Sequence, residues 1–230
     1  MAGFEGVCSA GERVQGPRLP HEETNALHRY SGRVAMKRVL LWFRNDLRTI
    51  DHPVLAGLEA DAFLPVAILP QRYFGTTSYG FPKTGPYRAA FLIETLACLR
   101  EELRNLGSDL LVVSGEPGRI IGDLVKQCSI DEVWHQEEPG TEEAAEASSV
   151  ARVLQGGPAR VRTFHGQTLY HPEDISFEMP DVYTDFRKAA ERTRAVRPPM
   201  PQPAKLPPLP LPVERFDIDP QTGHPTVAAL

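Results

Sequence analysis

Between residues 37 and 170, short apolar runs alternate with longer segments that have a helical period. The first run, Val39–Phe43, is continuously apolar, which is typical of a strand buried on both faces of a parallel sheet. Strands that are separated by helices pair in parallel through right-handed crossovers. The alternation therefore predicts an α/β fold with a doubly wound, five-stranded parallel sheet of the Rossmann-like type. The predicted strands are Val39–Phe43, Phe63–Leu69, Asp109–Ser114, Asp131–His135 and Arg160–Phe164.

The segments between these strands carry helix signals. The clearest helix is Pro86–Leu106, because leucines recur there at spacings of three and four and form one apolar stripe. Side chains that accept hydrogen bonds precede two other helices, which makes Asp51 and Thr141 the expected N-caps. These further helices are predicted at His52–Ala60, Pro117–Gln127 and Thr141–Leu154.

Composition excludes several classes of protein. The net charge of −5 does not favour a general nucleic-acid binder, which is normally basic. The three cysteines are scattered without metal-ligand spacing, so we expect a reducing, intracellular setting with Cys98 and Cys128 in the core. No apolar run approaches the roughly 20 residues of a membrane span, so no membrane partner is expected. The compartment is either the cytoplasm or, if the acidic N-terminal extension is a transit peptide, a chloroplast or mitochondrion.

The chain divides into three parts on composition. Residues 1–36 are polar and aperiodic, which indicates a disordered extension. Residues 37–197 form the predicted α/β domain. Residues 198–230 begin with eight prolines among fifteen residues, which indicates a polyproline-like linker and semi-rigid spacer. We expect this linker to be cut short before a second domain.

The usual nucleotide and catalytic motifs are absent. The first strand runs into "RNDLR" where a dinucleotide-binding protein would have GxGxxG, and no phosphate-binding GxxxxGK[ST] occurs. The segment "SGEPG" after the third strand is either an anion site at a helix N-terminus or an ordinary tight turn. No nucleophile–base set is found, so no catalytic residue is predicted. Ligands of such sheets bind beyond the carboxyl ends of the strands, which makes the loops there the candidate site.

Several segments resemble one family in the right order. "VLLWFRNDLRTIDHPVL" resembles the opening of photolyase/cryptochrome proteins, although His52 replaces their usual Asn after Asp51. "FLPVAILPQRYF" is similar to the next strand of the family and the loop after it. "FPKTG", the helix after it and "DVYTDFRKAAE" are similar to the DASH cryptochrome subfamily. The resemblance extends over roughly residues 37–230.

The resemblance implies an antenna domain. In the family, the N-terminal α/β domain carries an antenna chromophore, a methenyltetrahydrofolate in DASH proteins, and a helical C-terminal domain holds FAD and the DNA lesion. FAD and DNA are therefore expected only with that second domain, and the chain is expected to be inactive alone in blue-light sensing or in repair of cyclobutane pyrimidine dimers. Two alternatives remain: a fragment of an active photolyase whose C-terminal half is missing, and a non-catalytic interaction module.

The resemblance also suggests site residues. Glu138 matches the DASH carboxylate that binds the pterin ring, although a solvated loop glutamate has the same local pattern. Phe43 and Asn45 are expected beside the antenna. At the same strand end, an ion-pair network is expected to fix the loop through Arg44, Asp46 and Arg48.

A last group of residues is assigned to an interdomain face. Lys83 lies in the loop that faces the other domain in relatives, and Tyr183, Phe186 and Arg187 are expected to dock the interdomain connection. Since such a face is partly apolar, self-association or a protein partner is expected there.

Overall fold

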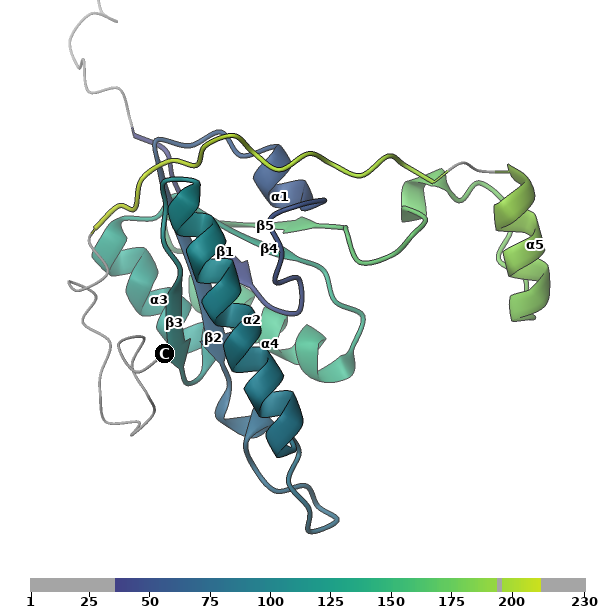
Figure 1. Ribbon diagram of the computed structural model, residues 1–230, viewed down its shortest axis with the longest axis horizontal. Helices are drawn as coiled ribbons and strands as arrows, with labels where there is room; N and C mark the ends of the chain where they lie inside the picture. The colour runs from purple at the N-terminus through teal and green to yellow at the C-terminus, as the bar shows by residue number, and fades with distance from the viewer. Residues whose placement is uncertain (1–35, 194–195, 212–230) are drawn as a thin grey trace, which may run out of the picture. The chain divides into compact units, whose positions relative to one another are not determined.

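The computed structural model describes residues 36–193 and 196–211. Its strands form one parallel sheet in the order β3-β2-β1-β4-β5 (Figure 1). The predicted α/β fold with five parallel strands is therefore confirmed. The predicted extension at residues 1–36 and the second half of the predicted linker lie almost wholly outside the described residues. The strands are β1 (Arg38–Phe43), β2 (Ala62–Leu69), β3 (Leu111–Ser114), β4 (Glu132–Gln136) and β5 (Arg160–Phe164).

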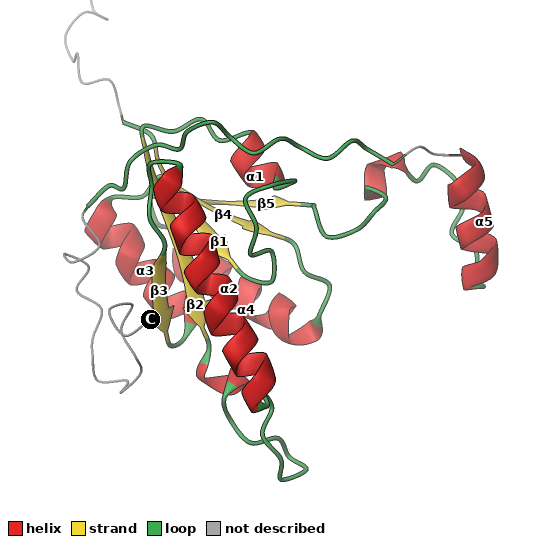
Figure 2. Ribbon diagram, viewed as in Figure 1, coloured by secondary structure: helices red, strands yellow, loops and turns green. Residues whose placement is uncertain are grey.

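Helices cover both faces of the sheet (Figure 2). Residues of α1 (Pro53–Ala56) and α2 (Pro86–Asn105) pack with Val39, Leu41 and Phe43 in one core cluster. Residues of α3 (Pro117–Cys128) and α4 (Thr141–Leu154) pack with Leu40 and Trp42 in the other. Because successive side chains of β1 point to opposite faces and both faces are buried, the strand is apolar at each buried position, from Val39 to Phe43.

The predicted leucine stripe of α2 is confirmed, and Leu96, Leu99 and Leu103 are buried. The remaining described elements are the 3-10 helices η1 (Gln71–Tyr73) and η2 (Pro172–Asp174) and the helix α5 (Tyr183–Thr193). None of the helices within the described ranges is both long and apolar enough to cross a membrane.

Three local predictions are wrong. Asp51 is not the N-cap of α1, because its backbone adopts a left-handed conformation with φ 52° and the cap is His52, whose Nδ1 accepts the N–H of Leu55 at 3.4 Å. Thr141 is the first residue of α4, and Gly140 before it is the N-cap. Cys98 is exposed on α2, whereas Cys128 is buried as expected.

The proline-rich segment lies against the domain. Asp51 and the backbone of Met200 hydrogen bond twice, through Asp51 N to Met200 O at 2.9 Å and Met200 N to Asp51 Oδ1 at 3.1 Å. Further along, Leu206 N donates to Leu106 O at 2.8 Å, and the Leu206 side chain is only 2% exposed. The described part of this segment is therefore anchored along the surface of the domain.

Candidate functional site

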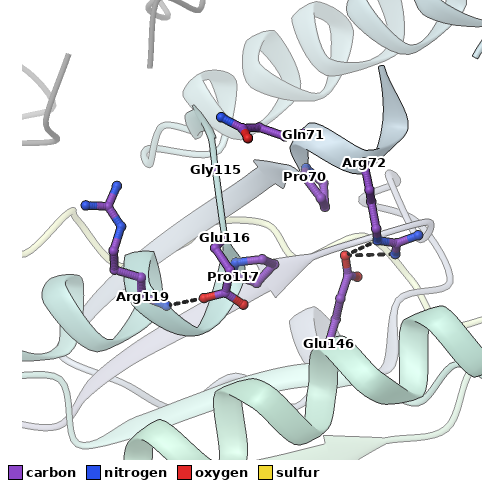
Figure 3. A pocket seen from close by; sticks show the side chains of 8 residues that line it. All are labelled: Pro70, Gln71, Arg72, Gly115, Glu116, Pro117, Arg119 and Glu146. Carbon is purple, nitrogen blue, oxygen red and sulfur yellow. Dashed lines mark hydrogen bonds and ion pairs between the residues drawn. The ribbon is translucent and has the colours of Figure 1, made fainter. Parts of the chain in front are cut away.

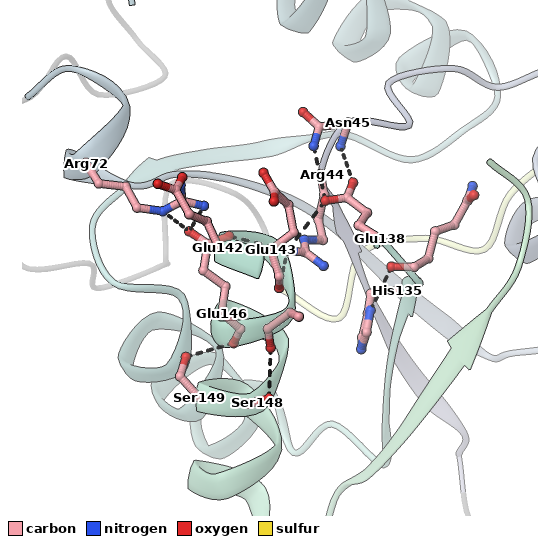
Figure 4. A network of polar contacts seen from close by, with 12 residues as sticks. Arg44, Asn45, Arg72, His135, Glu138, Glu142, Glu143, Glu146, Ser148 and Ser149 are labelled. Carbon is pink, nitrogen blue, oxygen red and sulfur yellow. Dashed lines mark hydrogen bonds and ion pairs between the residues drawn. The ribbon is translucent and has the colours of Figure 1, made fainter. Parts of the chain in front are cut away.

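Glu138 lies in the loop after β4 and holds two other loops. Its side chain is 3% exposed. One carboxylate oxygen, Oε1, accepts hydrogen bonds from Asn45 N at 3.0 Å and Gln167 Nε2 at 3.1 Å. The other, Oε2, accepts from Asn45 Nδ2 at 3.1 Å (Figure 4). Glu138 is therefore no solvated loop residue, because it ties the loops after β1, β4 and β5 together.

Arg44 is buried between β1 and α4. Its side chain is 3% exposed, and its guanidinium lies 4.5 Å from the ring centroid of Trp42. The Nη2 group donates to Glu143 O at 2.7 Å and lies 3.4 Å from Glu146 and 3.5 Å from Glu138 (Figure 4). The Nη1 group is buried and has no hydrogen-bond partner among the described residues. This arginine thus holds one unused donor inside the protein.

Asp46 pairs with His52 and not with the flanking arginines. Both side chains are fully buried, and His52 Nε2 lies 3.0 Å from Asp46 Oδ2. Because Nδ1 of His52 accepts a backbone N–H, Nε2 carries the proton and donates to the carboxylate. Burial alone would raise the pKa of Asp46, but the hydrogen bonds from His52 and from Arg44 N at 2.8 Å outweigh it and hold the pKa below its ordinary value.

The predicted ion-pair network among Arg44, Asp46 and Arg48 is therefore wrong in its pairing. Arg48 donates to two backbone carbonyls instead, to Asp51 O at 2.9 and 3.1 Å and to Gly166 O at 2.9 Å. All three residues still fix the loop after β1. They do so through separate partners: Arg44 contacts α4, Asp46 contacts His52, and Arg48 contacts Asp51 and Gly166.

Ion pairs continue from Arg44 toward the surface. Glu146 pairs with Arg72 at 2.8 Å, Arg72 also pairs with Glu142, and Glu142 pairs with Lys83. Lys83 therefore anchors the loop between β2 and α2 to α4. The structure does not bring Tyr183, Phe186 and Arg187 to this site. They lie on α5, where Phe186 packs on Phe177 and Arg187 pairs with Glu191.

A cavity of about 380 Å³ lies beyond the carboxyl ends of β1 and β2, and residues from the first half of α2 form one of its walls. Four of the residues predicted at the end of the first strand come together in its lining: Phe43, Arg44, Asn45 and Arg48. Glu138 is not among the lining residues and reaches the cavity through Asn45 and Arg44, which both line it. Ten of the seventeen lining residues are apolar or aromatic, and the other seven are polar and include three arginines.

The sequence interpretation missed one wall of this cavity. Arg88, Phe91 and Thr95 line it from α2, and Tyr73 lines it from η1. Burial, together with the nearby charge of Glu146, raises the pKa of Tyr73 and keeps its hydroxyl protonated. The spacing of Arg88, Phe91 and Thr95 by three and four residues was the available signal, since it marks a second face of the helix.

A second hollow of about 410 Å³ lies beside the first, at the end of β2 and the start of α3 (Figure 3). Glu146 lines both. In the segment "SGEPG", Glu116 accepts the N–H of Arg119 at 2.8 Å and so caps α3 with the chain's own carboxylate. This occupies the position that an external anion would take. No group of three or more His, Cys, Asp or Glu side chains in the described ranges is arranged to hold a metal ion.

Comparison with known proteins gives consistent results. A model of the DNA photolyase family matches residues 39–205. The cryptochrome DASH of Gloeobacter violaceus is 44% identical over 182 residues, which cover 77% of this chain and 36% of that protein. The cryptochrome DASH of Xenopus laevis is 41% identical over 193 residues, which cover 80% of this chain and 37% of that protein.

Solved structures agree in fold. A Synechocystis cryptochrome matches with a TM-score of 0.71 and 35% identity over 76% of this chain and 38% of its own. A class III photolyase from Agrobacterium tumefaciens matches with a TM-score of 0.65 and 27% identity over 78% of this chain and 37% of its own. The chain thus spans little more than a third of the length of these relatives. The family as a whole implies flavin and folate-type chromophores. The chain belongs to the photolyase/cryptochrome family, in its DASH branch.

Proposed function

We propose that this chain is an antenna module that holds a light-absorbing heteroaromatic ring, and that the ring is a folate of the methenyltetrahydrofolate type. The observation that supports this is the cavity of about 380 Å³ beyond β1 and β2, whose walls combine ten apolar or aromatic residues with seven polar ones. Small-molecule sites have volumes of roughly 300–1,000 Å³ and hydrophobic and aromatic walls that carry some polar groups. An exposed aromatic such as Phe91, which lines the cavity, suits stacking on a planar ring.

In this proposal, the light-driven chemistry of the full-length relatives takes place outside this chain. The chain spans 36–38% of the relatives' length, and FAD and the DNA lesion are expected in the remaining part of such proteins. Light-driven repair or photoreception would then require that part, with the antenna passing excitation to its flavin. We propose no bond-making step and no DNA contact for the described domain itself.

Glu138 serves the site indirectly in this proposal. Both of its carboxylate oxygens already accept hydrogen bonds from Asn45 or Gln167. A direct bond to a pterin ring would require the ring to reach a side chain that is 3% exposed and is not part of the cavity lining. The simpler role is to hold Asn45, which lines the cavity, in a fixed orientation.

The test is a titration of the full chain with 5,10-methenyltetrahydrofolate, followed by absorbance and fluorescence. Thr95 lines the cavity, whereas Ala97 lies two residues further on α2, is exposed and is not part of the lining. Thr95→Trp should fill the cavity and abolish binding, and Ala97→Trp should leave it intact. Equal binding by both variants would place the ligand elsewhere, and no binding by the wild type would reject the antenna role for this chain.

A protein interaction role is the second candidate, because exposed aromatics lie on the loop before α2 and on the first turns of α2. This aromatic patch consists of Tyr79, Phe81, Tyr87 and Phe91, which are 56–91% exposed. Aromatic residues at such density are typical of binding surfaces. Sedimentation of the full chain should reveal self-association that Tyr87→Ser weakens, while the change Leu169→Ser at a distant exposed residue should not. A monomer at all concentrations would remove self-association from the proposal.

A further inference from the structure

We propose that the free edge of β5 (Arg160–Phe164) is a docking site for an extended segment of a partner protein in which acidic and apolar residues alternate. The segment would pair with β5 as a sixth strand of the sheet. The lining of the cavity of about 380 Å³ contains no residue of β5, so this proposal is independent of the proposed antenna function.

The backbone of β5 is paired on one side only. β5 is the last strand of the sheet, and its one neighbour among the described strands is β4. Arg160 N donates to Asp131 O at 2.9 Å, and Glu137 N donates to Phe164 O at 2.8 Å. Successive residues of a strand direct their N–H and C=O groups to opposite sides, so the odd-numbered residues of β5 point away from β4. The free edge is therefore made by the backbone groups of Val161 and Thr163.

The side chains of β5 are also open to a partner. In β1 to β4 the side chains are buried or half-buried, whereas the first four of β5 are exposed. The strand at the opposite edge, β3, is buried from Leu111 to Val113. An added strand can therefore reach β5 without displacing a described part of the domain.

Two arginines give the free edge its positive charge. Arg160 and Arg162 are exposed, and neither forms an ion pair with a described residue. The chain nevertheless has 30 acidic residues against 25 lysines and arginines. Glu132, which lies opposite Arg160 in the register, pairs with Lys37 at 3.6 Å and accepts a hydrogen bond from Trp134 Nε1 at 2.6 Å. Carboxylates that complement the two arginines are therefore expected from outside the described residues.

The spacing of the arginines predicts the sequence pattern of the partner. Side chains two residues apart point to the same face of a strand, so acids two residues apart in an added strand lie next to Arg160 and Arg162. The Arg162 guanidinium lies 5.1 Å from the ring centroid of Trp134 and 4.7 Å from that of Phe164, which holds it on this face. On the other face, Val161 is 36% exposed and suits an apolar residue between the two acids.

The same charges disfavour a second copy of the chain as the occupant. Two β5 edges in contact would bring four arginines together, and like charges opposite one another destabilise a sheet. Arginine at an edge strand also hinders such self-pairing. The chain itself contains the favourable pattern at Asp217, Ile218 and Asp219, which lie outside the described residues. A test therefore has to separate a partner segment from this one.

The experiment measures the fluorescence anisotropy of labelled peptides that are titrated with the full chain. The acidic peptide GSEVEVESG should bind, and the glutamine version GSQVQVQSG should bind about three- to tenfold more weakly, because the ion pairs are lost. The peptide GSEEEVVSG has the same charge without the alternation and should be weakened as well. The acidic peptide with N-methyl groups on its glutamates and valines should not bind, because it keeps the charge but lacks the backbone donors.

Variants of β5 test the same contacts from the side of the domain. Arg160→Glu/Arg162→Glu should lose the acidic peptide and bind the lysine version GSKVKVKSG instead. Thr163→Pro should abolish binding, since it removes a backbone donor that faces away from β4 and leaves the pairing with β4 intact. Arg119→Glu/Lys126→Glu, at two exposed residues of α3, is the matched control for the change in charge and should alter nothing.

Each remaining outcome decides against one part of the proposal. Equal binding of the N-methylated peptide or of GSEEEVVSG would leave only charge attraction and overturn strand pairing, even if Thr163→Pro did not fold. Tighter binding of the acidic peptide by Asp217→Asn/Asp219→Asn than by the wild type would make the chain's own segment the occupant. A dimer in sedimentation that the acidic peptide dissociates would make the occupant a second β5. No binding by the wild type would overturn the docking site and leave the antenna function untouched.

Discussion

The polar network that runs from Glu138 and Arg44 out to Glu142 and Lys83 has a buried inner end and an exposed outer end. The two ends have different roles because they differ in burial. At the inner end, Glu138 and Arg44 have side chains that are 3% exposed, and they join loops that follow three different strands. At the outer end, Glu142 is 51% exposed and Lys83 is 31% exposed. Both ends contain opposite charges in contact. Only the inner end holds them where water cannot compensate a lost partner.

This difference changes what a substitution measures. Removing one partner of a buried pair leaves an uncompensated charge and polar groups without acceptors. Removing one partner of an exposed pair leaves a group that water can solvate, so the effect is small and depends on salt. We therefore expect the inner end to determine the geometry of the cavity wall, and the outer end to restrain the loop before α2 only weakly.

The largest effect is expected for Glu138→Ala. This change removes the acceptor of Asn45 and Gln167 and one counter-charge of Arg44. We expect a loss of about 3–5 kcal/mol in the free energy of unfolding, measured by urea denaturation. Glu137→Ala is the control, since that neighbouring side chain is 68% exposed. A cost below about 1 kcal/mol for Glu138→Ala would mean that the inner end is no more critical than the surface.

Asp46→Asn is expected to cost about 1.5–3 kcal/mol at neutral pH, because it removes the charge that accepts from His52 and from Arg44 N. The pKa of Asp46 is lowered in the folded protein, so its stabilisation is complete above its unfolded pKa of about 4 and is lost as the pH falls below that value. The difference between wild type and variant, measured by urea denaturation from pH 7 to pH 3, should therefore shrink below about pH 4. A difference that is constant over this range would show that the carboxylate charge has no role.

Gly166→Ala tests how tightly the third loop packs against the inner end. A Cβ atom at this glycine would lie 2.7 Å from Gln136 Oε1 and 2.7 Å from the Pro53 ring. The proline ring cannot give way, so we expect a loss of about 1–3 kcal/mol. Gly75→Ala is the matched control, because its Cβ position meets only ordinary contacts at 3.7 and 3.9 Å. Equal stability of the two variants would show that this loop can move away from Gln136 and Pro53.

The sheet and its helices could be predicted because their signals are local and periodic. The predicted bounds Thr141–Leu154 and Arg160–Phe164 equal those of α4 and β5. The apolar run of β1 and the leucine stripe of α2 also fixed which faces are buried. These patterns depend on neighbours within a few residues. For that reason a single sequence was sufficient for the architecture.

The hydrogen bonds and ion pairs between the loops at the strand ends could not be predicted in the same way. Glu138 meets Asn45 across 93 positions of the chain, and no periodic pattern connects them. The charges next to Asp46 in sequence suggested Arg44 and Arg48 as partners, yet His52 is the partner because the loop turns back on itself. Side chains two residues apart would share a face in an extended strand, but the chain bends at Arg44 and Asn45, so proximity in sequence was misleading there.

The smallest effect is expected at the outer end, for Lys83→Ala. The lysine pairs with Glu142 on the surface, and the hydrogen bond from Lys83 lowers the pKa of that carboxyl. We expect no measurable change in the urea midpoint, because water replaces the lost contact. Hydrogen exchange in residues 74–85 should nevertheless accelerate, since Lys83 is one of the few links between this loop and α4. Raising the salt concentration should accelerate exchange in the wild type in the same way. If Lys83→Ala instead lowered the urea midpoint as far as Glu138→Ala does, burial would not be what separates the two ends of the network.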